Sequence, residues 1–182
     1  MLFPIIATLS MVLGATAEAE YVDHPIYKSW AQFKPGTVTT TKSVTIQEGK
    51  RIDAIITHKL VERTDEKVVI EMIFANDATG KMEENSAQKL TYNRKFPLFP
   101  GVKREEIGKP MGVLEDGEET LKIGAKEYKT HWYDTKAKVE AGDILTRAWM
   151  SDEVPGQLIK TVHKVPKADK VTTVTLVEIK TP

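Results

Sequence analysis

The sequence predicts a mainly β protein: a single curved antiparallel sheet or half-open barrel of about nine strands with one short N-terminal helix. Three observations support this fold class. Apolar and polar residues alternate with a period of two over most of the chain after residue 37. Short turn signals separate the alternating stretches, so neighbouring strands pair as hairpins. Pro155-Gly156 marks a corner between two apolar strands, because a type II turn takes Pro at its second position and a positive φ at its third.

Residues 1–19 are expected to be a signal peptide. Residues 2–14 form an uncharged, largely apolar run that is too short to span a bilayer. Small residues at positions 15, 17 and 19 offer cleavage before Glu18 or before Glu20. No Lys or Arg follows the first Met, so an uncleaved anchor or a buried strand is the alternative. No cysteine follows the run, which excludes a lipid-anchored bacterial lipoprotein.

Residues 20–182 are predicted to be a single β domain that is periplasmic or secreted, with no stable membrane span once the signal peptide is removed. The chain has no cysteine, so disulfides and thiolate chemistry are excluded and packing must supply the stability. An exported chain without disulfides is typical of a bacterial envelope. The 26 basic and 26 acidic residues are interspersed, so we expect neither a nucleic acid nor an anionic membrane as partner.

A short helix is predicted near the start of this domain, within residues 23–33. Asp23 can cap it and Pro25 suits its first turn. Ile26, Trp30 and Phe33 then recur at helical spacing and give it one apolar face. The predicted strands are Thr37–Gln47, Arg51–Arg63, Lys67–Ala75, Ala87–Arg94, Glu119–Ile123, Glu127–Thr135, Ile144–Ser151, Gln157–Val165 and Val171–Lys180.

Residues 95–117 interrupt the strands with many prolines and glycines. The segment is long for a connection inside a compact domain, yet it carries apolar residues such as Phe99 and Leu114 that are costly to leave in water. It is expected either to fold back and complete the core or to cover a cavity as a lid.

Several predicted strands are apolar on both faces, for example at Ile55 with Ile56 and at Trp149 with Met150. A one-sided antiparallel sheet alternates more cleanly. The sheet is therefore expected to curve, with one face filled by core and the other partly covered or lining a cavity.

No pattern in the sequence indicates catalysis, a metal or a cofactor. The histidines His24, His58, His131 and His163 are dispersed, which favours structural roles over a zinc site. No serine lies in a nucleophile motif, the paired carboxylates fall in predicted turns, and no glycine-rich phosphate loop is present. The chain is expected not to be an enzyme.

The aromatic residues are the remaining site candidates, because apolar ligand cavities use aromatic and aliphatic walls. A plain hydrophobic core is the alternative interpretation. The predicted ligand-binding residues are Phe74, Phe99, Tyr128, Trp132, Trp149 and Met150, and Trp30 is a further aromatic candidate for the cavity wall.

Three stretches carry a resemblance to known proteins. They are Trp149-x-Ser151-x-x-Val154-Pro155-Gly156-x-Leu158-Ile159-Lys160, Gly124-Ala125-Lys126-Glu127-Tyr128 and Ser29-Trp30-Ala31-x-Phe33-Lys34-Pro35-Gly36. With them the chain resembles uncharacterised exported bacterial β-proteins, which in turn are distantly similar to the LolA-like lipoprotein-carrier superfamily. The resemblance implies a half-open barrel with covering segments over a concave apolar face, which holds acyl chains in the carriers.

The first functional hypothesis is therefore a non-catalytic exported protein that binds an apolar or lipid-like ligand in the concave face, with residues 95–117 as cover. The second is a cell-envelope protein-interaction or structural module that uses an exposed sheet face or edge to bind a protein partner. A hydrolase that the motifs do not reveal is a third, for which a buried pair of His and carboxylate would be diagnostic.

Overall fold

The computed structural model describes residues 20–76, 83–84, 87–139 and 142–182. The predicted signal peptide lies outside the described residues. In the part of the chain that is described, no helix is long enough and apolar enough to cross a membrane.

The described chain consists of strands with one α-helix and two short 3-10 turns. In chain order these are β1 (Tyr21–Asp23), α1 (Pro25–Ala31), β2 (Val38–Gln47), β3 (Lys50–Arg63), β4 (Lys67–Asn76), β5 (Glu83–Glu84), β6 (Gln88–Asn93), β7 (Lys95–Pro97), η1 (Arg104–Glu106), β8 (Val113–Ile123), β9 (Lys126–Val139), β10 (Gly142–Met150), β11 (Leu158–Val165), η2 (Pro166–Ala168) and β12 (Lys170–Lys180).

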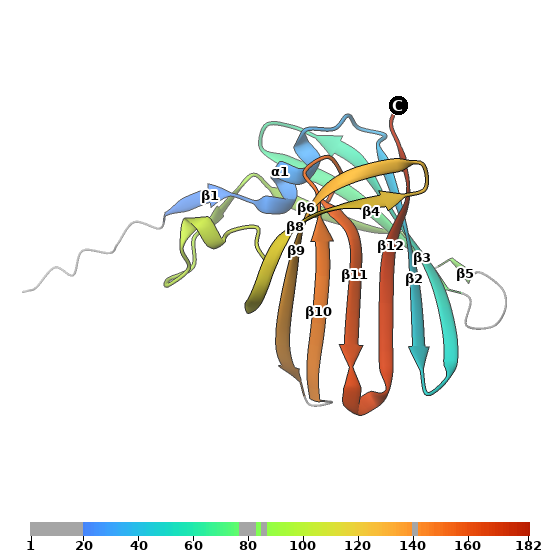
Figure 1. Ribbon diagram of the computed structural model, residues 1–182. Helices are drawn as coiled ribbons and strands as arrows, with labels where there is room; N and C mark the ends of the chain where they lie inside the picture. The colour runs from blue at the N-terminus through green and yellow to red at the C-terminus, as the bar shows by residue number, and fades with distance from the viewer. Residues whose placement is uncertain (1–19, 77–82, 85–86, 140–141) are drawn as a thin grey trace, which may run out of the picture.

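The strands form one large antiparallel sheet that does not close into a barrel (Figure 1). Its order is β5-β4-β3-β2-β12-β11-β10-β9-β8, and β6 pairs with β4 beside β5, which gives ten strands. A separate ribbon joins β1 to β7. The N-terminal and C-terminal meanders meet where β2 pairs with β12. The predicted fold class, a single curved antiparallel sheet with one short helix, is confirmed.

The β8–β9 hairpin bends across the upper end of the sheet, near the end of β12 (Figure 1). Tyr128 of this hairpin packs with Trp149, Val154, Ile159 and Leu176 in a buried cluster. Register shifts in the pairs β10–β11 and β12–β2 lie near this end. Because a β-bulge increases local twist, these irregularities explain how a hairpin can cross its own sheet.

Helix α1 builds a second cluster on the other half of the sheet. Its residues Tyr27 and Trp30 pack with Leu60, Val68 and Ile70 of β3 and β4. The apolar face of the helix, which the sequence predicts from its helical spacing, therefore packs against the sheet as expected. The cap differs from the prediction: His24, not Asp23, caps the helix, because its Nδ1 accepts the Ile26 N–H at 3.1 Å.

Asp23 instead belongs to β1 and pairs with Lys95 of β7 at 2.7 Å. The strand holds its backbone in line with β7, so its side chain is taken by a cross-strand ion pair. The predicted cap was wrong because β1 has only three residues, which is too short for its strand pattern to be visible in the sequence.

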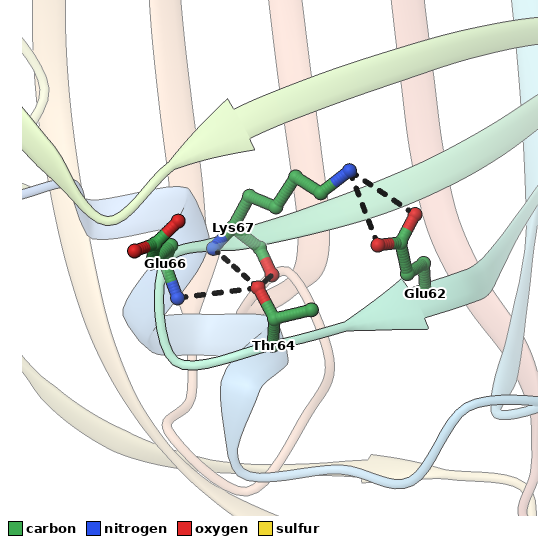
Figure 2. Close-up of polar contacts among 4 residues, drawn as sticks. All are labelled: Glu62, Thr64, Glu66 and Lys67. Carbon is green, nitrogen blue, oxygen red and sulfur yellow. Dashed lines mark hydrogen bonds and ion pairs between the residues drawn. The ribbon is translucent and has the colours of Figure 1, made fainter.

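The turn between β3 and β4 is tied by the side chain of Thr64 (Figure 2). Its Oγ1 accepts the N–H groups of Glu66 and Lys67 at 3.2 and 3.0 Å, and Lys67 Nζ pairs with Glu62 at 3.1 Å. Tyr27 Oη donates to the Thr64 carbonyl at 3.1 Å. The turn thus anchors the helix as well as closing the hairpin.

The Pro155-Gly156 corner is a type II turn, as the sequence predicts. The Gln157 N–H donates to the Val154 carbonyl at 2.8 Å, and Gly156 has φ +76°. The strands on either side are β10 and β11, and they pair up to Met150 and Leu158.

Residues 95–117 neither complete the core nor form one long loop. The segment contributes β7, the η1 turn and the start of β8, and large apolar side chains stay in solvent. Met111 is 94% exposed and Phe99 is 63% exposed. The two buried clusters are formed instead by α1 with β3 and β4 and by the β8–β9 hairpin with β10, β11 and β12.

Candidate functional site

A cavity of about 320 Å³ lies between α1, the sheet and the Pro155-Gly156 corner. It is lined mainly by apolar side chains, and none of the lining residues is Asp, Glu, Lys or Arg. The lining residues are Ile26, Trp30, Thr39, Thr41, Ile56, His58, Ile70, Leu90, Tyr92, Pro155, Gly156, Leu158 and Val174. They come from α1, from β2, β3, β4, β6 and β12, and from the corner and start of β11.

The cover of this cavity is fixed by polar contacts at the C-terminal end of α1. Arg63 Nη1 donates to the carbonyls of Ala31 and Phe33 at 3.1 Å each. Gln32 Nε2 donates to the Asp152 carbonyl at 2.8 Å, which ties the helix to the corner. The cover is therefore α1 and residues 155–158, whereas no residue of the expected cover, residues 95–117, lines the cavity.

Trp30 and Gly156 meet closely above the cavity. Trp30 is 3% exposed, and a Cβ placed on Gly156 would lie 3.2 Å from its Nε1. Glycine is needed at this position for both its positive φ and this approach. The two residues join the helix cover to the corner cover.

His58 is a titratable side chain in the cavity wall that can both donate and accept a hydrogen bond. Within the described residues its ring nitrogens have no hydrogen-bond or ion-pair partner, and burial lowers the pKa of His58. The ring is therefore neutral near pH 7, with one nitrogen that donates and one that accepts. Thr41 is already engaged, since its Oγ1 donates to the Ile56 carbonyl at 3.3 Å.

Two larger clefts lie on the other side of α1 and are polar. Their volumes are about 680 and 640 Å³, and both are lined by Gly108, Tyr133, Asp152 and Gln157. Their walls carry charges of both signs, which suits solvent more than an apolar ligand. We therefore take the smaller apolar cavity as the candidate site.

The larger polar cleft contains ionisable groups, among them His131 and Tyr133. His131 Nε2 lies 3.1 Å from Asp116 Oδ2, and the His131 ring packs on Tyr133 with centroids 4.6 Å apart. Burial and the nearby Asp116 and Asp152 raise the pKa of Tyr133. The His131 pair is solvent-exposed. Among the described residues no group of three or more His, Asp or Glu is placed to hold a metal ion.

The six predicted ligand-binding residues do not share one site. Val174, which lines the cavity, is in register with Thr161 and, through it, with Ala148. Trp149 is the next residue along β10 and points to the opposite face of the sheet. Its register partner Trp132 lies on that face with it.

On that opposite face the aromatic residues pack against their neighbours, and Trp149 and Tyr128 also line two further clefts of about 520 and 560 Å³. The guanidinium of Arg147 lies 4.5 Å from the Trp132 ring centre and pairs with Asp134 at 2.7 Å. Trp149 donates from Nε1 to Glu119 and packs in the buried cluster with Tyr128.

The other three residues lie apart. Phe74 is in register with Ile56, so it shares the face of the cavity without lining it. Met150 lines the larger polar cleft, and Phe99 is exposed in the segment after β7. The cavity is also lined by Ile26, Ile56 and Ile70, which were not predicted as ligand-binding residues. Ile26 lies on the apolar stripe of the helix, and Ile56 and Ile70 lie on strands that are apolar on both faces.

Searches of family models and of curated proteins find no match to this chain. Solved structures do resemble it. One is an exported protein with a YmcC-like fold from Bacteroides fragilis NCTC 9343, at 12% identity and a TM-score of 0.49, covering 89% of this chain and 99% of that one. A second is MucB in complex with MucA(peri), at 9% identity and a TM-score of 0.48. It covers 86% of this chain, which spans about half (53%) of that one.

A third solved structure is an outer membrane lipoprotein-sorting protein domain from Vibrio parahaemolyticus. It has 8% identity and a TM-score of 0.30, and it covers 80% of this chain and 84% of that one.

Proposed function

We propose that this chain is a non-catalytic exported protein that holds an apolar or lipid-like ligand in the cavity under α1. The observation that carries the proposal is the cavity itself: about 320 Å³, with no charged side chain in its lining and a helix fixed over it. Ligand pockets of about 300 to 1,000 Å³ are usual, and apolar walls with a few placed polar groups are their common form.

The size and the chemistry of the cavity limit the ligand. A volume near the low end of the usual range accommodates a single chain or a small apolar group rather than a whole phospholipid. His58 offers one donor and one acceptor to an uncharged polar group on that ligand. A ligand with one apolar body and one hydrogen-bonding end fits these walls best.

The test begins with protein recovered from the envelope fraction of its host without detergent. Native mass spectrometry followed by organic extraction should reveal a bound apolar molecule, and the mass should report the N-terminus of an exported chain. A clean ligand-free mass would count against the proposal.

A variant with a matched control locates the binding. Leu90→Trp fills the cavity from the edge strand β6, whereas Leu114→Trp adds the same bulk at an exposed position outside it. Uptake of the neutral fluorescent probe N-phenyl-1-naphthylamine should be lost in the first variant and kept in the second. Equal uptake by two folded variants would place the binding elsewhere.

A second candidate function is favoured by the exposed apolar side chains of residues 99–114. Met111, Phe99 and Leu114 lie in solvent on one segment, as at interaction surfaces. In that case the chain is an envelope interaction module with a protein partner. A photo-crosslinking residue at Met111 should capture a defined partner in cells, and one at the exposed Lys122 should not.

A further inference from the structure

One row of side chains crosses the lower part of the sheet and combines basic with apolar residues. Lys136 of β9 is in register with Leu145 of β10, and Leu145 with Lys164 of β11. The row continues through Val171 of β12, Ile46 of β2 and Arg51 of β3. Residues in register point to the same face, so these six side chains lie side by side across six strands. We call them the basic-apolar row.

The apolar members of the row are exposed. Ile46 is 48% exposed, Leu145 is 40% exposed and Val171 is 36% exposed. At a strand spacing of about 4.8 Å the row is about 24 Å wide. Single exposed apolar residues are common on protein surfaces, whereas neighbouring ones on one sheet face often mark an interaction site.

The row contains no acidic residue. Lys136 and Arg51 make ion pairs with Asp143 and Asp53 at 2.7 Å each, from neighbouring rows. Lys164 has no ion-pair partner among the described residues. The row therefore presents positive charge beside its apolar side chains.

The turns below the row add more positive charge. The β2–β3 and β11–β12 turns lie at this end of the sheet, where β9 also ends and β10 begins (Figure 1). The described residues of this end, 46–52, 136–139, 142–145 and 164–171, contain seven basic and three acidic residues. Glu140, which falls outside the described residues, is a fourth acidic residue in the sequence of this end. A hydrogen bond from Lys136, together with the nearby charges of Lys138 and Lys167, holds the pKa of Asp143 below its usual range.

We infer that this end of the sheet, with the basic-apolar row, is a docking surface for an anionic phospholipid bilayer. Lysine and arginine beside exposed aliphatic groups match a bilayer interface, where anionic headgroups attract the cations and the apolar side chains enter the headgroup boundary. The excess of positive charge makes the same surface repel a second copy of this chain. This inference does not depend on the cavity or its ligand.

The experiment measures co-sedimentation of the exported protein with vesicles. Vesicles of phosphatidylcholine with about a third phosphatidylglycerol are compared with phosphatidylcholine alone. Binding is expected to the first only, and it should weaken as salt rises because screening shortens the range of the attraction. All variants have the same N-terminus, so a difference in vesicle binding between them is caused by the substituted residues and not by the N-terminal segment.

Two pairs of substitutions test the charge. Lys138→Glu with Lys164→Glu should weaken binding to the anionic vesicles by about tenfold or more, since each basic residue near the surface contributes about a factor of five. Lys89→Glu with Lys122→Glu makes the same change in net charge away from this end and should bind like the parent. If both pairs weakened vesicle binding equally, the net charge of the protein would explain the binding and the inference would be overturned.

Leu145→Thr with Val171→Thr tests the apolar members of the row while keeping residues that favour strands. Binding should fall severalfold, with unfolding transitions unchanged. If no anionic vesicle is bound, the inference fails. If light scattering instead shows self-association that these variants abolish, the surface joins copies of the chain and the bilayer is excluded.

Discussion

The ring of Trp132 lies directly over the backbone of Gly117. The two residues are register partners on β9 and β8, and a Cβ placed on Gly117 would come within 2.8 Å of the ring atom Cζ2. Contacts that short do not occur, so any side chain at residue 117 must displace the indole. Trp132 also stacks with Arg147, so the displacement would spread along the outer face of the sheet.

Gly117→Ala is expected to destabilise the protein by about 1 to 3 kcal/mol, the usual cost of overpacking. Chemical unfolding followed by tryptophan fluorescence measures it. Lys122→Ala, at an exposed position on the same strand, is the control and should be nearly neutral. In a Trp132→Leu background the cost of the alanine should shrink, and an unchanged cost would mean that the ring is not the obstacle.

Gly156→Ala should be more damaging than Gly124→Ala. Both glycines have positive φ, which costs an alanine about 1 to 2 kcal/mol. At Gly124 nothing lies within 4 Å of an added Cβ, whereas at Gly156 the Trp30 Nε1 is 3.2 Å away. The difference between the two free energies of unfolding isolates the contact with the helix. Equal values would show that α1 yields to the added methyl.

The stability of the protein should fall as the pH drops below about 6.5, the ordinary pKa of histidine. Burial lowers the pKa values of His24, His58 and His163 in the folded state. The unfolded chain therefore takes up protons first, and the stability present above the unfolded pKa is lost as the pH falls through the folded pKa.

Replacing His24 should remove the part of this pH dependence that comes from the helix cap. Its Nδ1 caps α1 only while it carries no proton, whereas an asparagine oxygen can accept the same bond at any pH. His24→Asn should therefore flatten the fall in the free energy of unfolding between about pH 7 and pH 5. A variant with the slope of the parent would exclude the cap as a titrating group.

A second pH effect is expected at acid pH from Asp53. Arg51 Nε at 2.7 Å and Lys42 Nζ at 2.9 Å hold the pKa of this carboxyl far below its usual range. Its contribution to stability is present above the unfolded pKa of about 3.9 and is lost as the pH falls through the folded value.

Carbon-13 NMR titration measures the Asp53 pKa directly. Arg51→Met and Lys42→Met should each raise it, with the larger rise for Arg51, whose hydrogen bond is the strongest cause of the shift. Asp53→Asn should lessen the acid loss of stability, and Asp65→Asn in the exposed β3–β4 turn should not. A titration of Asp53 near pH 4 in the parent would contradict the geometry.

Strands and helix were predictable from the sequence because each follows a local period. Val38 to Gln47 alternates, Ile26 and Trp30 recur at helical spacing, and Pro155-Gly156 is a local turn signal. Strand ends were less predictable: β9 continues to Val139, where a connection was expected from residue 136. Pairing with β10 extends the strand beyond what its Lys-rich end indicates.

The site was less predictable, because it depends on curvature and on which face a residue occupies. Trp149 and Ala148 differ by one position and lie on opposite faces, and only the register with Val174 reveals which one faces the cavity. The clustering of basic residues was also not predictable, because it depends on strand pairing. Lys164 and Arg51 are far apart in a chain with balanced charges, yet strand pairing places them in one row.

The two buried clusters have no residue in common. One joins α1 to β3 and β4, and the other joins the β8–β9 hairpin to β10, β11 and β12. Units with separate apolar contacts can open one at a time, at a lower free energy than global unfolding. The half that carries α1 can thus loosen and open the cavity while the other half keeps its packing. Amide hydrogen exchange would then be faster in α1 and β6 than in β10 and β11.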